Sequence, residues 1–313
     1  GFFSPSIMRR FWELSYTLGT PMKKLDNLSL VIVIVIVIFD LLVWGQIVFA
    51  KPAGNPALYF LDVGQGDGTL LSLPGDIQIL TDAGPNQSAV REVEQALGSS
   101  DRYIDLAIIT HPQLDHFNGF YYLLDRYEFG AFIINGRTDA AAKKEWEALI
   151  GKIKAKKIPL ITLAAGDRIR SGDNTLDFLS PDASWIQSGE LNDTSFVAMV
   201  RTTDWSALLT GDIGANVEGD LTEKYDLKAD ILKVPHHGSK YSSSEQFLRE
   251  VEPKLAVIEV GENRYGHPTR EVLSRFDAVG VKTFRTDRDG TVKMETNGRM
   301  LRVFLLDKQD VRQ

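Results

Sequence analysis

The chain contains no cysteine among its 313 residues. This absence excludes a disulfide framework and any metal site built on thiolates. The chain also lacks an excess of positive charge, because 42 acidic residues outnumber 35 basic ones and the formal net charge is −7. A globally basic field that would collect polyanions is therefore excluded, and any contact with nucleic acid would need a local basic patch.

A single long apolar run is present near the N-terminus, Leu28 to Ala50, with the sequence LSLVIVIVIVIFDLLVWGQIVFA. About 20 apolar residues are enough to cross a bilayer as a helix. We therefore expect a transmembrane anchor over 28–50, an N-terminal segment over 1–27 and a short linker over 51–56. Asp40 lies within the run, where a carboxylate is costly in lipid, so we expect it to face a partner helix, take a proton or mark a weak anchor.

The charges that flank this run predict its orientation. Four basic residues precede it and one follows closely: Arg9, Arg10, Lys23, Lys24 and Lys51. The positive-inside rule then places 1–27 in the cytoplasm and the rest of the chain outside it, in a single-pass protein of the cell membrane. A cleaved signal peptide is the alternative, but Val48 and Ala50 form a poor cleavage site and the apolar region is long for that role.

Residues 57–313 alternate short apolar runs with amphipathic segments. The runs Ala57–Val63, Gly68–Leu73 and Ile77–Thr81 are separated by turn sequences and predict an antiparallel start. Helical patterns such as Gln87–Leu97 and Asp139–Lys156 follow, interleaved with further strands. This alternation predicts a layered α+β or α/β domain. No internal linker or repeat divides residues 57–306, so we expect one domain.

Histidine is scarce, and its placement is the most informative feature of the chain. The five histidines lie in three short polar segments, THPQLDHFNG, KVPHHGS and YGHP, as His111, His116, His236, His237 and His267. Each segment follows, or lies close behind, an apolar run of strand character. Because the ends of neighbouring strands share one edge of a sheet, we expect these side chains to meet in one site. Histidine is the most common metal ligand in proteins and the usual acid–base group near neutral pH.

Two carboxylates accompany the histidines. Asp115 lies between His111 and His116, and a turn at Pro112 could fold both rings around a common point; a helix N-terminal Asp with incidental histidines is the alternative. Asp212 follows a buried strand through a glycine turn, which alone is ordinary turn chemistry. Nitrogen and oxygen ligands without sulfur suit Zn²⁺ or Mn²⁺ in a hydrolytic site with open water positions. Such an ion acidifies bound water toward neutral pH.

An ordered set of segments resembles the metallo-β-lactamase superfamily, and within it the extracytoplasmic hydrolase domain of ComEC-type competence (DNA-internalisation) proteins. The segments are FLDVGQGDG (60–68), LTDAG (80–84), THPQLDHFNG (110–119), NDTSFV (192–197), LLTGDI (208–213), LKVPHHGSKYSS (232–243), YGHPTREVLSRF (265–276) and RTDRDGTV (285–292). The resemblance implies an αββα four-layer sandwich, an α+β fold, over 57–313, preceded by the transmembrane helix. It places the metal at one edge of the two sheets.

The resemblance also implies roles for individual residues. It makes His111, Asp115 and His116 metal-motif residues, Asp212 the bridging or single-metal carboxylate, and His236 or His237 the late histidine ligand. Three further carboxylates on strand-end turns beneath the site are expected to orient the ligands: Asp62, Asp67 and Asp82. For Asp62 and Asp67, turn formation is the alternative.

Two positions depart from the superfamily pattern. The usual motif reads His-x-His-x-Asp-His, and here Gln113 occupies the third position. A mid-chain histidine is missing near Asn192, a replacement that is general in the ComEC-like group. A site built from Asp115, His116, Asp212 and His236 or His237 survives both changes. We therefore expect one tightly bound Zn²⁺ or Mn²⁺ and a doubtful second site.

The residues predict a membrane-anchored, metal-dependent hydrolase, whose bound hydroxide could attack phosphodiesters, lactones, amides or thioesters. The resemblance to the ComEC-type proteins implies a phosphodiester, with single-stranded DNA as substrate in a competence-like setting. Asp115 or Asp212 would accept the proton of the water, His267 or His237 would protonate the leaving oxygen, and Lys240 would offset phosphate charge. Because one membrane helix cannot form a pore, a separate channel subunit is the expected partner. The alternatives are a membrane-anchored nucleic-acid-binding or assembly module with a degenerate metal site, and a hydrolase of small lactones or β-lactams.

Overall fold

The computed structural model describes residues 27–49, 54–138, 141–188, 190–296, 298 and 300–306. The chain divides into two compact units, Gly1–Pro52 and Ala53–Gln313, and each is considered separately. The expected cytoplasmic segment falls outside the described residues except for its last residue, and so do 51–53 of the expected linker and residues 307–313.

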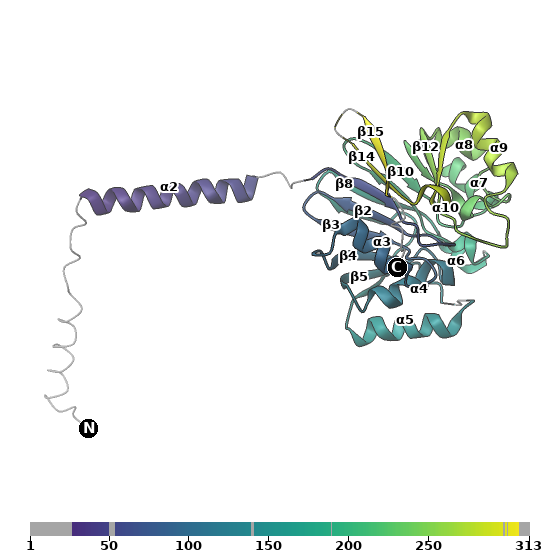
Figure 1. Ribbon diagram of the computed structural model, residues 1–313, viewed down its shortest axis with the longest axis horizontal. Coiled ribbons are helices and arrows are strands. Elements are labelled where there is room, and N and C mark those ends of the chain that lie inside the picture. Colours follow the sequence, from purple (N-terminus) through teal and green to yellow (C-terminus); the bar gives the residue numbers. More distant parts are fainter. Residues whose placement is uncertain are drawn as a thin grey trace, which may run out of the picture. The chain divides into compact units, whose positions relative to one another are not determined.

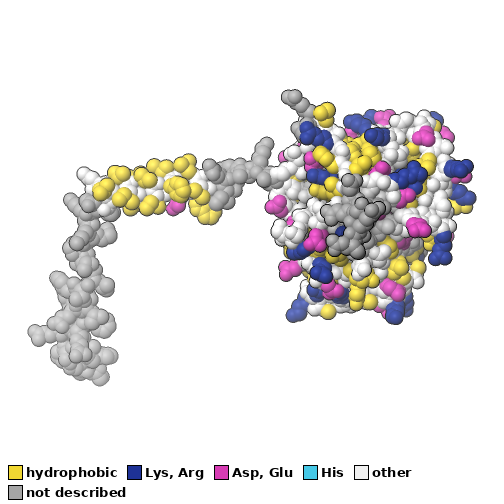
Figure 2. All heavy atoms as spheres, in the orientation of Figure 1, with side chains coloured by type: hydrophobic (Ala, Val, Ile, Leu, Met, Phe, Trp, Pro, Cys, Tyr) yellow, Lys and Arg dark blue, Asp and Glu magenta, His cyan; other side chains and the backbone are white. Residues whose placement is uncertain are grey.

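The described part of the first unit is the helix α2 (Asn27–Phe49). Its β-branched run Val31–Ile38 also suits a buried strand, but here it is helical. Between Leu28 and Trp44 the helix presents hydrophobic side chains (Figure 2), and none of those described is buried. Helix α2 is therefore long and apolar enough to cross a membrane, as the sequence predicted.

Two β-sheets form the centre of the second unit (Figure 1). In order across the eight-stranded sheet, the strands are β15 (Leu301–Leu306), β14 (Thr291–Thr296), β1 (Ala57–Phe60), β2 (Thr69–Leu73), β3 (Ile77–Thr81), β4 (Tyr103–Ile108), β5 (Glu128–Ile134) and β6 (Leu160–Thr162). In order across the seven-stranded sheet, they are β13 (Lys282–Arg285), β12 (Leu255–Ile258), β11 (Ile231–Lys233), β10 (Ser206–Leu209), β9 (Val197–Arg201), β8 (Asn174–Ser180) and β7 (Arg168–Ser171).

Helices cover the outer face of each sheet. The eight-stranded sheet packs against α3 (Ser88–Leu97), α4 (Leu114–Leu123) and α5 (Lys143–Ala155) through one apolar cluster. The seven-stranded sheet packs against α7 (Ala215–Lys224), α8 (Glu245–Val251) and α9 (Arg270–Val279) through another. A third cluster fills the space between the two sheets. The short elements are α6 (Ala183–Ser188), α10 (Thr286–Asp289) and the 3₁₀ turns η1 (Asn192–Thr194) and η2 (Pro235–Gly238). This order of layers confirms the αββα sandwich.

The alternation of side chains in β1 shows how one short strand joins two of these cores. Leu58 and Phe60 belong to the cluster between the sheets, while Ala57 and Tyr59 belong to the cluster beneath the helices. Successive side chains of a strand point to opposite faces, so a strand covered on both faces needs apolar residues throughout. All four residues of β1 are accordingly buried.

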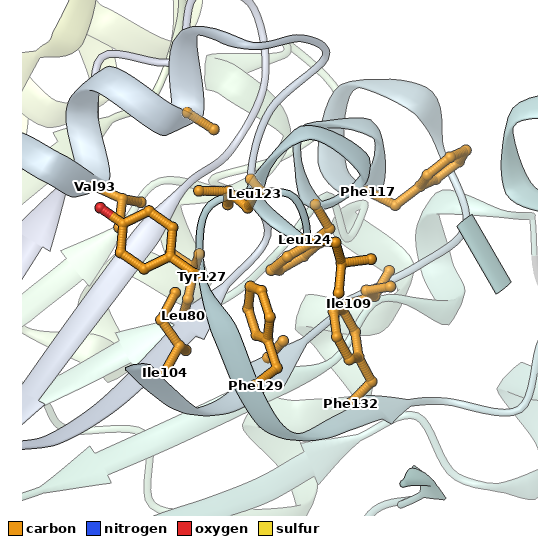
Figure 3. Close-up of a cluster of buried hydrophobic side chains, with 14 of the residues drawn as sticks. Leu80, Val93, Ile104, Ile109, Phe117, Leu123, Leu124, Tyr127, Phe129 and Phe132 are labelled. Atoms are coloured by element: carbon orange, nitrogen blue, oxygen red, sulfur yellow. The ribbon is translucent and has the colours of Figure 1, made fainter. Parts of the chain in front are cut away.

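Packing against β5 holds helix α4 in place, and the first turn of this helix carries the predicted site residues Asp115 and His116. Figure 3 shows Phe117 and Leu123 of α4 packed in one cluster with Phe129 and Phe132 of β5. The ring of Phe120, also in α4, lies edge-on to Phe132 at a centroid distance of 5.3 Å. Such edge-to-face pairs add about 0.5–1.5 kcal/mol to the burial of each ring. The helix ends at Leu123, and the residues after it form a hydrogen-bonded turn.

The strand directions bring distant loops to one edge of the sandwich. Strands β3, β4 and β5 are parallel, and so are β10, β11, β12 and β13. Parallel strands end at the same edge, where loops carry polar residues positioned by a rigid scaffold. The segments that follow β3, β4, β10, β11 and β12 contain most of the carboxylates and histidines that the sequence analysis singled out, and Asp62 and Asp67 lie in the loop between β1 and β2.

Candidate metal centre

The structure gathers histidine and aspartate side chains into four overlapping groups. Within each group, ligand atoms lie within 4.8 Å of one another. The members are His111, His116, His237, Asp67, Asp82, Asp115 and Asp212, and all are buried except the half-buried Asp115. Seven of the residues named from the sequence therefore meet, although Asp67 and His237 are far apart along the chain.

Hydrogen bonds fix the protonation of His111. The Thr110 hydroxyl donates to Asp82 Oδ2 at 2.6 Å, and the Ser195 hydroxyl donates to the Asn192 carbonyl oxygen at 2.6 Å. Each hydroxyl therefore has only lone pairs left for His111 Nδ1, at 3.0 and 3.1 Å. His111 Nδ1 must donate to them, so its Nε2 presents a lone pair to the site.

His116 and His237 are held in the same way. His116 Nδ1 lies 2.8 Å from Asp82 Oδ2, and its Nε2 lies 3.3 Å from Asp212 Oδ2. His237 Nδ1 donates to the carbonyl oxygen of Glu259 at 2.8 Å, and its Nε2 lies 3.3 Å from the same oxygen of Asp212. A partner on Nδ1 that fixes ring orientation is the usual arrangement for a metal-binding histidine.

Several buried atoms at this point have no hydrogen-bond partner among the described residues. They are the Nε2 atoms of His111, His116 and His237 and the Oδ1 atom of Asp212. An unsatisfied buried polar group costs about 1–3 kcal/mol. Lone pairs on imidazole nitrogen and carboxylate oxygen at 3.3 Å also repel unless a cation lies between them. The donor set therefore fits a divalent ion such as Zn²⁺ or Mn²⁺.

The acid–base properties of the site agree with this need for positive charge. Burial disfavours the charged forms of His116 and His237, but Asp212 and other carboxylates outweigh it and raise their pKa well above the ordinary value. Burial also opposes charge on Asp212, yet these two histidines hold its pKa well below the usual range. A metal ion would displace the protons, so metal binding is expected to release protons and to weaken at low pH.

The adjacent histidines His236 and His237 diverge. Both have left-handed backbone conformations, with φ of 51° and 53°, in the turn η2. This unusual backbone directs His237 into the site, where it is buried, while His236 is half-buried and belongs to none of the four groups. Gly238 completes the turn with φ +79°, and a Cβ there would lie 2.6 Å from Pro268. Of the two candidates for the late ligand, the structure brings only His237 to Asp212.

The two departures from the superfamily motif face each other. Gln113 Nε2 donates to Asn192 Oδ1, and Asn192 Nδ2 lies 3.1 Å from His236 Nε2. The amides therefore satisfy one another and hold His236, although 79 positions separate them in the chain. Two imidazole ligands are thus replaced by a hydrogen-bonded pair that offers a metal far weaker ligands.

A buried lysine beneath the site was not anticipated. Lys233 is 2% exposed and forms an ion pair with Asp67. Its Nζ donates to the Gly211 carbonyl oxygen at 2.8 Å and lies 3.8 Å from Asp212 Oδ1. Asp67 also lies 3.3 Å from His237 Nδ1. Lys233 therefore connects Asp67, which lies beside His237, with the segment Gly211–Asp212. In the sequence, the one indication of this role is a charged residue inside the apolar run ILKV.

Glu259, a second buried residue that the sequence analysis missed, accepts hydrogen bonds from the Gly68 N–H at 2.9 Å and from the Thr69 hydroxyl at 3.0 Å. Burial and the neighbouring Asp67 raise its pKa to about 8, against the pull of Lys233. Asp62 is also buried, and its N–H donates to the Thr291 hydroxyl at 2.9 Å, but it is not a member of the four groups.

A cavity of about 510 Å³ opens onto the centre. Asp115, Asp212 and His237 line it, together with His236 and His267. Burial and the rings of His236 and His237 lower the pKa of His267 to about 4, so this ring is neutral at neutral pH. Lys240 is not among the residues that line the cavity; its Nζ lies 5.0 Å from the centre of the exposed Tyr241 ring.

Comparisons with known proteins agree with this geometry. ComE operon protein 3 of Bacillus subtilis (strain 168) is 28% identical over 259 residues, which cover 77% of this chain and 33% of that protein. Competence protein ComA of Neisseria gonorrhoeae is 29% identical over 248 residues, which cover 78% of this chain and 33% of that protein. The chain thus spans about a third of the length of these curated relatives.

A solved structure and a family model give the fold and the family. The crystal structure of the metallo-beta-lactamase fold protein YhfI from Bacillus subtilis matches with a TM-score of 0.51 at 13% identity, covering 76% of this chain and 100% of that one. The sequence model of the metallo-beta-lactamase superfamily matches residues 61–261, which is more than half of the chain. The chain belongs to the metallo-beta-lactamase superfamily.

Proposed function

We propose that this chain is a metal-dependent phosphodiesterase that cleaves single-stranded DNA. The observation that carries the proposal is the convergence of unsatisfied imidazole nitrogens on Asp212 at the base of an open cavity. The names of the competence-protein relatives support DNA as the substrate.

Asp115, His116, Asp212 and His237 are the proposed ligands of one tightly bound ion. When bound, Zn²⁺ or Mn²⁺ would supply Lewis acidity and a water molecule of lowered pKa. The pairing of Gln113 with Asn192 supports a single tight site, since His111 is left without the imidazole partners of a second one. Asp67 and Asp82 support the ligands by holding Lys233 and His116 respectively.

The remaining chemistry is assigned to side chains that face the cavity. Burial disfavours charge on Asp115, but the nearby His237 and His116 lower its pKa to about 2, so its carboxylate is ionised at neutral pH and is available to orient the water and accept its proton as a weak base. His237 Nδ1 donates to Glu259 and its Nε2 is a proposed metal ligand, which favours His267 as the group beside the leaving oxygen. Because its pKa is lowered to about 4, His267 is neutral at neutral pH and would stabilise that oxygen by donating a hydrogen bond from its N–H. Lys240 would have to leave the Tyr241 ring to offset phosphate charge.

The proposed location is the cell membrane, with a single span and the hydrolase unit outside the cytoplasm. Helix α2 supports the span, and the basic residues before it support the orientation. Within the described ranges, α2 is also the one helix long and apolar enough to cross a bilayer. We also propose a separate membrane channel subunit as the partner that passes DNA, which the names of the competence-protein relatives support.

Two alternatives predict different observations. A nucleic-acid-binding or assembly module with a degenerate metal site is favoured by the Gln113–Asn192 pair, and it requires that the purified chain bind single strands without retaining metal. A hydrolase of small lactones or β-lactams predicts a deep apolar pocket. The observed cavity is lined largely by amide, carboxylate and imidazole groups, which disfavours it.

The test compares the full chain with its Asp115→Ala and His116→Ala variants. We expect about one bound ion per wild-type chain by elemental analysis, following the single intact ligand set. Both variants should lose that ion together with the Mn²⁺- or Zn²⁺-dependent cleavage of a single-stranded oligonucleotide. Glu250→Ala, on the exposed side of α8, is the control and should retain both. Full cleavage by either site variant contradicts the proposal.

A further inference from the structure

An exposed aromatic ring stands on the wall of the candidate metal cavity. Tyr241 and Tyr265 are the most exposed tyrosines in the described part of the chain, at 70% and 68%. Of the two, only Tyr265 lines the cavity that contains Asp212 and His237. An exposed aromatic ring beside a reaction centre is a candidate contact for a flat ligand group.

The loop that carries Tyr265 is fixed by one side chain. Asn263 Oδ1 accepts hydrogen bonds from the N–H groups of Tyr265 at 3.1 Å and His267 at 3.0 Å. Asn263 Nδ2 donates to the carbonyl oxygens of Gly261 and His267, both at 2.9 Å. The tyrosine is therefore presented by a braced backbone, so that a ligand contacting its ring need not order the loop first.

Tyr265 begins a row of rings that leads toward the metal centre. Its ring is stacked on His267 with an interplanar angle of 22° and a centroid distance of 5.9 Å. The ring centroid of His267 lies 5.7 Å from that of His236, which lies 6.3 Å from the ring centroid of His237. A flat group stacked on Tyr265 would therefore lie beside the same cavity as the proposed reaction centre.

The chemistry of the ring and its setting select a nucleobase. Bases of a single strand stack on exposed aromatic side chains with little dependence on sequence, whereas bases inside a duplex are already stacked and paired. A lactone or β-lactam has no aromatic plane in its reacting ring. The backbone phosphate next to a stacked base would lie beside the proposed metal ligands Asp115 and Asp212.

We propose that Tyr265 is a base-stacking residue that makes this site selective for single-stranded DNA. The inference rests on the proposed function for its substrate class. It adds a residue and a physical reason for strand selectivity. It also predicts that the phosphate backbone alone, without bases, is a poor ligand of the cavity.

Binding is measured on the full chain in detergent, after EDTA treatment, by fluorescence anisotropy. The probes are a short labelled oligothymidylate and an abasic oligomer with the same number of phosphates. Tyr265→Ala should weaken oligothymidylate binding on the order of 10- to 100-fold, the range seen for loss of a stacking aromatic ring. Abasic binding should be unchanged, and Tyr265→Phe should bind like the wild type. Tyr103→Ala is the control for an exposed tyrosine outside the cavity and should also bind like the wild type.

The inference and the proposed function fail in different ways. Equal binding of both probes by the wild type, or an equal loss of both in Tyr265→Ala, overturns the stacking role whether or not the chain cleaves DNA. Conversely, selective loss of oligothymidylate binding in a chain that cleaves no DNA with Mn²⁺ or Zn²⁺ supports Tyr265 as a stacking residue while contradicting the nuclease. Where cleavage occurs, the same variant should raise KM for the oligonucleotide and leave KM for the abasic oligomer unaffected.

Discussion

Replacing Lys233 by methionine tests the buried ion pair beneath the site. Methionine keeps much of the hydrocarbon length and removes the charge and the hydrogen-bond donors. The substitution leaves Asp67 buried without its closest cation and removes one of two donors to the Gly211 carbonyl oxygen, which keeps the His236 N–H at 3.1 Å. Removing one partner of a buried ion pair costs about 3–5 kcal/mol, because the remaining charge is uncompensated.

The neighbours of Asp67 determine where in that range the loss in the free energy of unfolding should fall. His237 and His116 lie 3.3 and 3.7 Å from its carboxylate oxygens and provide partial compensation, which favours the lower end. The lost hydrogen bond to Gly211 adds about 1 kcal/mol. For a unit of this size, each 1 kcal/mol shifts Tm by about 2–4 °C, so the melting temperature should fall by about 6–20 °C.

The assay is denaturant and thermal unfolding of the EDTA-treated chain, followed by circular dichroism. Lys228→Met is the matched control, because Lys228 pairs with Glu252 on the surface and both side chains are more than half exposed. This control should unfold like the wild type. Asp67→Asn should partly rescue Lys233→Met, since it removes the stranded charge. A loss below about 1 kcal/mol in Lys233→Met, or strictly additive effects of the two changes, would refute the reasoning.

Two further predictions concern the acid–base and ligand assignments. Glu259 has a pKa raised to about 8, so the stability that its protonated form contributes is full below about pH 4.5 and is lost as the pH rises through 8. Between pH 5 and 8, the free energy of unfolding of Glu259→Gln should therefore rise relative to that of the wild type, by up to about 1.4 kcal/mol per pH unit. Parallel pH profiles of the two unfolding free energies would contradict this. His237→Ala should lower metal affinity by more than the roughly 10- to 100-fold cost of losing an outer partner, and His236→Ala by less, as measured by titration with Mn²⁺ or Zn²⁺. The reverse order of the two variants would show that the late ligand is His236.

Much of the site could be predicted because its residues follow strand ends. His111, Asp115 and Asp212 each come after an apolar run, and parallel strands deliver their ends to one edge whatever the details of the loops. The choice between His236 and His237 could not be predicted. Adjacent residues share the same pattern, and the choice depends on left-handed backbone angles in η2 that depend on tertiary packing around Gly238.

Contacts between distant segments likewise could not be predicted from the sequence. The Gln113–Asn192 pair joins a helix start to a 3₁₀ turn, and nothing local to either residue indicates the other. Lys233 is a charged residue within a buried strand, but nothing local to it indicates that its partner Asp67 lies in the loop before β2. In the fold, the short strands β7 and β13 and the helix α6 were not predicted. Their four- to six-residue spans are too short for hydrophobic periodicity to identify.

The most direct test of the central claim is a metal titration of DNA cleavage. The full chain, freed of metal with EDTA, is mixed with a single-stranded oligonucleotide, and Mn²⁺ or Zn²⁺ is added stepwise while cleavage and bound metal are measured together. The predicted result is no cleavage without metal, followed by a rise that saturates at about one bound ion per chain, the number that one intact ligand set can hold. Undiminished cleavage by the metal-free chain, or no cleavage with the ion bound, would contradict the account.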